Sequence, residues 1–242
     1  MSGHSKWATI KRKKASIDAA RGKVFTKIIK EITIAARDGG GDPAGNPRLR
    51  LAIQQAKGSN MPQDNITRAI KKGTGELEGV KYEEITYEGY APHGIAVMIE
   101  SVTDNRNRTV AELRHIISKN NGNMGESGSV AWMFDRKGVI NVEKTGITED
   151  DLMEVILEAG ADDLKNEGDY FEVISSMENF EKVRKAIEDK GCKIESASLQ
   201  YLAKDLVAIE GSAQDAVLKF LEAVEDNDDV QNVYSNADFQ SE

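Results

Sequence analysis

Between residues 138 and 200, strand-like and helix-like segments follow one another in a regular succession. Runs rich in β-branched and apolar residues predict strands, and amphipathic stretches predict helices. In chain order these are strand 138–143, helix 149–159, strands near 162–166 and 169–175, helix 177–189 and strand 192–200. This βαββαβ order is the ferredoxin-like pattern.

The segments on either side of this unit predict a second α/β domain. EEITYEGY and GIAVMIESVT indicate two strands joined by a turn, residues 106–120 indicate a helix, and SVAWMF indicates a further strand. The C-terminal stretch from DLVAIEG to NVYSN predicts strand, helix and strand, with no partner left in the 138–200 unit. We therefore expect it to complete the sheet begun at residue 82, which makes residues 138–203 an insertion.

The N-terminal third is predicted to be a small helical bundle. KVFTKIIKEITIAARD forms an amphipathic helix that ends before Gly39-Gly40-Gly41. At about 100° per residue its apolar side chains gather on one side. A stripe of cations lies on the opposite side, which is expected to face outward, with Ile34 among them: Lys23, Lys27, Lys30 and Arg37. Asn46-Pro47 and Asn60-Met61-Pro62 are start signals for two more helices, which end at Gly58 and Gly73.

The expected fold class is therefore α+β, with an N-terminal helical bundle followed by two α/β domains, at least one of them ferredoxin-like. The expected boundaries are a basic helical domain at 1–78 and a discontinuous α/β domain formed by 79–136 and 204–242. The inserted ferredoxin-like domain is expected at 137–203.

Charge is segregated along the chain. The whole sequence carries a net −9, yet residues 1–72 hold 16 of the 32 Lys and Arg residues and only 5 of the 41 Asp and Glu residues. That gives +11 for residues 1–72 and −20 for the remainder. The alternative is that these charges are only solvated surface. The strength of the segregation favours a basic binding module joined to an acidic body.

The cations suggest where nucleic acid would bind. One cluster surrounds an aromatic residue: Lys6, Trp7, Lys11, Arg12, Lys13 and Lys14. Cations neutralise phosphates and release counterions, which gives affinity independent of sequence. Trp7 could stack on an unpaired base or fill the core of the bundle. The stripe of Lys23, Lys27, Lys30 and Arg37 is a second candidate. Arg106 and Arg108, at the start of a helix, could contact bases or phosphates, or simply accompany a helix cap.

Nothing in the sequence predicts catalysis. The three histidines and the single Cys192 have no metal-ligand spacing, and GGGDPAGN and GTGELEG lack the patterns of phosphate or dinucleotide loops. We therefore expect no catalytic residues, metal, cofactor or small-molecule substrate. No run approaches the ~20 apolar residues of a membrane span. A single cysteine and the lack of a secretory signal favour the cytoplasm.

Long segments resemble the YebC/PmpR family. They are GHSKWATIKRKKASIDAARGKVFTKIIKEI, YEGYAPHGIAVMIESVTDNRNRT, GSVAWMFDRKG and EDNDDVQNVYSNAD. The resemblance runs nearly end to end. It implies a helical N-terminal domain with two α/β domains, and it carries over no catalytic residues.

The resemblance leaves the target of binding divided. Bacterial members are described as DNA-binding transcriptional regulators, so the first hypothesis is a cytoplasmic DNA-binding regulator of transcription. Similar proteins, including a mitochondrial translational activator of cytochrome oxidase, act on translation. The alternative is therefore a translation factor that contacts ribosomal RNA and assists synthesis of proline-rich stretches. An uncharacterised enzyme is a third hypothesis. The acidic α/β domains could also take a protein partner.

Overall fold

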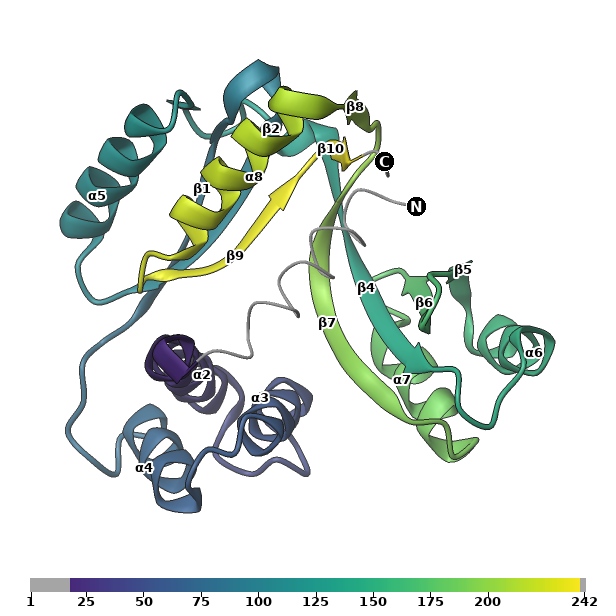
Figure 1. The fold of residues 1–242 in the computed structure, drawn as a ribbon. Helices are drawn as coiled ribbons and strands as arrows, with labels where there is room; N and C mark the ends of the chain where they lie inside the picture. Colours follow the sequence, from purple (N-terminus) through teal and green to yellow (C-terminus); the bar gives the residue numbers. More distant parts are fainter. Residues whose placement is uncertain (1–17, 240–242) are drawn as a thin grey trace. The chain divides into compact units, whose positions relative to one another are not determined.

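The computed structural model describes residues 18–239. They divide into two compact units, Phe134–Lys204 and a larger unit whose described part comprises residues 18–133 and 205–239. The α+β class, with a helical N-terminal part and two α/β parts, is confirmed (Figure 1).

The larger unit begins with three helices: α2 (Asp18–Gly39), α3 (Pro47–Gly58) and α4 (Gln63–Gly73). Their apolar faces form one core that includes Ile28, Ile32, Leu49 and Ile66. Asn46 is the N-cap of α3, as the sequence predicts, and its Oδ1 accepts a hydrogen bond from the Leu49 amide at 3.0 Å. Its Nδ2 donates to the carbonyls of Ala35 and Gly40, so the same side chain fixes the end of α2.

The α/β part of the larger unit is an antiparallel sheet in the order β3-β1-β2-β9. The elements are β1 (Glu83–Tyr90), η1 (Pro92–Gly94), β2 (Ala96–Thr103), α5 (Arg106–Lys119), β3 (Asn123–Met124), η2 (Ala131–Met133), β8 (Val207–Ile209), α8 (Gly211–Glu225), β9 (Val230–Ser235) and β10 (Ala237–Phe239). Helices α5 and α8 cover one face of the sheet (Figure 1). Strand β9 pairs with β2, and β8 pairs with β10 in a separate parallel ladder.

The core of this sheet comes from alternate residues at the start of β2 and directly before it. Ile95, Val97 and Ile99 point toward α5 and α8, where Phe220 is fully buried. Burying side chains of this size stabilises a fold by about 1.5–3 kcal/mol each. The resulting rigid sheet holds the loop after α8 next to the end of β2.

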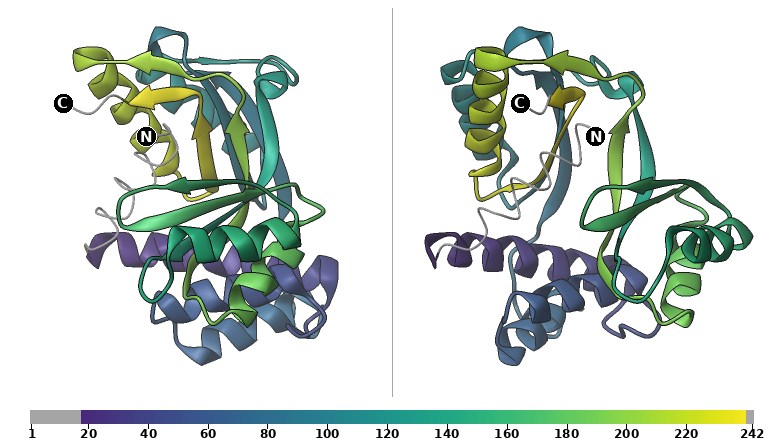
Figure 2. Two further views of the ribbon diagram at one scale, coloured as in Figure 1. Left: turned by 90° about the vertical axis from the view of Figure 1, so that its right-hand side faces the viewer. Right: turned by 45° about the vertical axis from the view of Figure 1, so that its right-hand side comes forward.

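The smaller unit has the ferredoxin-like order of strands, β5-β6-β4-β7. Its elements are β4 (Phe134–Glu143), α6 (Glu149–Ala159), β5 (Ala161–Asn166), β6 (Tyr170–Ser175), α7 (Phe180–Asp189) and β7 (Ile194–Ala203). All neighbouring strands are antiparallel, and Figure 2 shows α6 and α7 on the same face. Leu152, Ile156, Val183 and Ile187 are buried beneath them.

The prediction that SVAWMF forms a strand is wrong. Residues 131–133 form a single 3-10 turn, and β4 begins only at Phe134. The physical reason is Glu88, whose carboxylate accepts from the amides of Gly128, Val130 and Ala131 at 2.6, 2.8 and 2.8 Å. Those donors are therefore committed to a side chain and cannot join a ladder.

Candidate nucleic-acid interface

The first candidate cluster lies outside the described residues. Lys6, Trp7, Lys11, Arg12, Lys13 and Lys14 all precede residue 18, where the description of the chain begins. Their contribution to binding stays a prediction.

The cationic stripe on α2 meets the C-terminal end of α8. Lys27 Nζ donates to the Glu225 carbonyl at 2.7 Å, and Lys23 Nζ reaches both the carbonyl and the carboxylate of Asp226, at 3.1 and 2.7 Å. The last carbonyls of a helix lack partners within the helix and carry partial negative charge. Lysines one turn apart on α2 therefore satisfy the open end of α8.

Lys30 continues this row into the protein interior. It is only 6% exposed. Its ammonium donates to Asp229 Oδ1 at 2.6 Å, to the Asp228 carbonyl at 2.9 Å and to the Val102 carbonyl at 3.1 Å. Three acceptors match the three donors of an ammonium group. Lys30 is therefore a structural residue that joins α2 to the end of β2 and to the loop after α8.

Asp229 accepts hydrogen bonds from side chains of three elements: α2, β2 and α5. Besides Lys30, its Oδ2 accepts from Thr109 Oγ1 at 2.7 Å, from Arg108 Nη2 at 2.8 Å and from Thr103 Oγ1 at 3.2 Å. Burial by itself would raise the pKa of this carboxyl, but the bonds from Arg108, Lys30 and Thr109 outweigh burial and lower the pKa to about 2. Asp229 thus stays charged and links two segments that are far apart in the sequence, TDNRNRT and EDNDD.

The expectation that the α2 stripe faces outward is therefore corrected. Ile34, which lies among the cations, is 1% exposed, as a residue on a covered face must be. Arg37, at the far end of the stripe, is exposed, donates to the Tyr82 carbonyl and pairs with Asp38 at 2.7 Å. The stripe faces the α/β part of the larger unit because acidic side chains and backbone carbonyls at and after the end of α8 accept hydrogen bonds from its lysines.

The two arginines predicted at the start of α5 have different surroundings. Arg108 pairs with Asp104 and Asp229, both at 2.8 Å, and these carboxylates raise its pKa. The side chain of Asn105 accepts from the Arg108 amide and caps the helix. Arg106 is exposed and has no ion pair with any residue between 18 and 239. Of the two predicted arginines, Arg106 alone keeps its guanidinium available for a partner.

Helix α4 presents cations that the sequence patterns above did not single out. Arg68, Lys71 and Lys72 are exposed, and the described part of the chain gives none of them an acidic partner. Their spacing of three and four residues places them on neighbouring turns of one face. The sequence does contain an indication of this face. The apolar Ile66, Ala69 and Ile70 alternate with these cations along the helix, so the cations must point away from the core.

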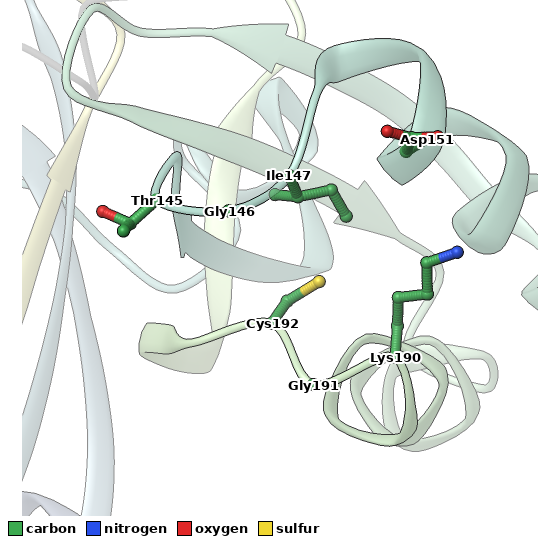
Figure 3. Close-up of a pocket in the computed structure, with 7 residues that line it drawn as sticks. All are labelled: Thr145, Gly146, Ile147, Asp151, Lys190, Gly191 and Cys192. Carbon is green, nitrogen blue, oxygen red and sulfur yellow. The ribbon is translucent and has the colours of Figure 1, made fainter.

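A shallow hollow of roughly 230 Å³ lies in the smaller unit (Figure 3). It is lined by Thr145, Gly146, Ile147, Asp151, Lys190, Gly191 and Cys192. Burial raises the pKa of the Cys192 thiol, which therefore holds its proton and is a weak nucleophile. Among residues 18–239, no cluster of three or more His, Cys, Asp or Glu side chains is arranged to hold a metal. None of the helices described there is both long and apolar enough to cross a bilayer.

Comparison with known sequences covers nearly the whole chain. The family model described as "TACO1/YebC protein N-terminal domain" matches residues 5–76, and "TACO1/YebC second and third domain" matches residues 82–237. A "Probable transcriptional regulatory protein" of Pelodictyon phaeoclathratiforme is 59% identical over 237 residues, covering 98% of this chain and 95% of the relative. A relative of the same name in Trichlorobacter lovleyi is 58% identical over 242 residues, covering 100% and 98%.

A solved structure has the same fold. The crystal structure of a conserved hypothetical protein from Aquifex aeolicus matches with a TM-score of 0.86 and 46% sequence identity, covering 94% of each chain. Helices α2 to α4 lie within the residues that the first family model matches, and strands β1 to β9 lie within those that the second matches. The chain belongs to the TACO1/YebC family.

Proposed function

We propose that this protein is a nucleic-acid-binding regulator of gene expression that acts in the cytoplasm as a DNA-binding regulator of transcription. The observation that carries the proposal is the unpaired cationic face of α4, formed by Arg68, Lys71 and Lys72. The relatives named as transcriptional regulatory proteins support the same direction.

The proposed interface combines this face with the basic N-terminal cluster. Lys6, Lys11, Arg12, Lys13 and Lys14 would contact phosphates, and Trp7 would lie among them. Arg106 is a further proposed contact on the α/β part. Lys23, Lys27 and Lys30 hold the α8 end, so their charges are already compensated within the protein. Regulation, and not turnover of a substrate, is the proposed role.

The test is binding of a labelled DNA duplex by the full chain over a range of salt concentrations. Each phosphate contact contributes roughly −0.9 to the slope of log affinity against log salt. The triple variant Arg68→Ala, Lys71→Ala, Lys72→Ala should flatten the slope by about two to three units. An unchanged slope would show that α4 does not contact phosphates.

A matched control removes the same charge elsewhere. Lys119, Lys185 and Lys219 are also exposed, and no described residue pairs with them. Replacing these three by Ala changes the net charge equally but should leave the slope nearly unchanged. A duplex RNA of the same sequence is measured in parallel, and clearly tighter binding to RNA would favour the translational alternative.

A further inference from the structure

A groove of roughly 310 Å³ is lined by residues of α2, α4 and the linker 74–82. Figure 1 shows this linker running from α4 to β1. The lining of the groove includes Arg37, Lys72, Leu77, Val80, Lys81 and Tyr82. Every charged residue in this wall is a cation. Glu76 and Glu78 belong to the same linker but do not line the groove, and Glu76 accepts from the Thr74 hydroxyl.

The wall of the groove exposes apolar surface that a solvated linker would ordinarily hide. Leu77 is 42% and Val80 53% exposed, while Ile34 is buried at 1%. Half-buried Tyr82 also lines the groove, and Lys30 Nζ lies 5.9 Å from the centre of its ring. An occupant of this groove would therefore need an apolar face to cover Leu77, Val80 and Tyr82.

The two cations at the edge of the groove are available to an anion. Lys72 and Lys81 are exposed, and neither has an ion pair among residues 18–239. The stem of Lys72 passes so close to Gly79 that a Cβ there would lie 3.3 Å from its Cβ and Cγ. A glycine at this position lets the linker pack on the stem, which leaves the ammonium at the rim.

We propose that this groove binds one unstacked nucleotide of a single-stranded nucleic acid, the base lying against Leu77, Val80 and Tyr82 and the phosphates meeting Lys72 and Lys81. An aromatic and apolar floor beside unpaired cations is the combination that holds single strands without sequence preference. The inference rests on the proposed nucleic-acid function and adds a site to it; the groove shares Lys72 with the cationic face of α4, whereas Arg68 and Lys71 do not line it.

The test uses the full chain and fluorescein-labelled oligonucleotides of about 12 nucleotides, oligothymidine and oligouridine, beside a duplex of similar length. The double variant Leu77→Ser, Val80→Ser changes only exposed side chains, so the fold is retained. We expect its affinity for single strands to fall about tenfold, with duplex affinity unchanged. In the wild type, 5-iodouracil placed in the strand should crosslink to Tyr82.

A matched control replaces equally exposed apolar residues of the smaller unit, Leu157→Ser and Met177→Ser, and should bind single strands like the wild type. The groove proposal is overturned if the double variant binds single strands as tightly as the wild type while duplex binding persists. If the wild type binds neither strand form, the proposed function fails as well. Comparison of oligothymidine with oligouridine tells which strand chemistry the groove prefers.

Discussion

Lys30 on α2 and Asp229 beyond α8 are 199 positions apart in the chain, yet their side chains form a buried ion pair with an Nζ–Oδ1 distance of 2.6 Å. Side-chain exposure is 8% for Lys30 and 5% for Asp229. The pair joins the helical part of the larger unit to its sheet.

Replacing Asp229 should lower the free energy of unfolding more than replacing Lys30 does. Asp229→Ala leaves the buried Lys30 ammonium without its counter-charge, and we expect the free energy of unfolding to fall by about 3–5 kcal/mol. Lys30→Met leaves Asp229 bonded to Arg108 and Thr109, and the decrease should be about 1–2 kcal/mol. Urea denaturation followed by circular dichroism measures both. Equal decreases would contradict the central role of Asp229.

The pH dependence of stability should carry the signature of Asp229. Its pKa in the folded protein, about 2, lies below the ordinary 3.8, so folding favours the charged form. The stabilisation is complete above the ordinary pKa and disappears as pH falls toward the folded value. Allowing for solvent screening, the stability gap between wild type and Asp229→Asn should shrink by about 1–2 kcal/mol between pH 5 and pH 2. A gap that stays constant would contradict this assignment.

Glu88 should control the turn that precedes β4. Burial alone would raise its pKa, but three backbone amides outweigh burial and lower it, so the carboxylate is charged and holds the turn. Glu88→Ala leaves those amides without their acceptor, and hydrogen exchange at Gly128, Val130 and Ala131 should quicken about 10- to 100-fold. Glu126→Gln, an exposed neighbour, is the control and should leave exchange unchanged.

The N-terminal cluster should add to the salt dependence of binding. Replacing Lys11, Arg12, Lys13 and Lys14 by Ala should flatten the log-log slope on duplex DNA by about one unit for each phosphate that is no longer neutralised. Four exposed lysines elsewhere, Lys119, Lys185, Lys190 and Lys219, form the matched control set. A flattening of the same size in both sets would assign the effect to net charge alone.

Sequence discrimination should be poor. Lys71 and Lys72 are flexible point charges, and of the α4 cations only Arg68 has the planar fork that suits base edges. Affinities for random duplexes should therefore vary within about 1–2 kcal/mol, compared with about 4–10 kcal/mol for a protein that reads an operator. Selection from random DNA measures this directly. A single sharp motif with a large affinity gap would refute it.

Local signals predicted most of the elements. Thr148 accepts from the Asp151 amide, and α6 begins at Glu149, where the sequence pattern places it. Apolar periodicity likewise predicted α5 and the succession of helices and strands along the chain in the smaller unit. The turn at 131–133 escaped prediction because Glu88, far away in sequence, takes its amides.

The partners of the α2 stripe could not be predicted in the same way. A cation that contacts phosphate and a cation that caps a distant helix have the same spacing along α2, so periodicity does not separate them. Ile34 was the one local indication, since an apolar side chain among cations belongs to a covered face. The identity of the covering segment depends on tertiary pairing, which the charge pattern of α2 does not encode.

The long separation between Lys30 and Asp229 sets an order of events during synthesis. At about 5–20 residues per second, the 199 positions between them take about 10–40 s to translate. Strand β9, which pairs with β2, is also made long after β2. The smaller unit is one contiguous stretch of chain. It can therefore fold before β9 and Asp229, the partners of β2 and α2, have been synthesised. For that interval the lysines of α2 lack the acceptors that residues 225–229 supply, and the nascent chain displays cations that the finished protein pairs with that segment.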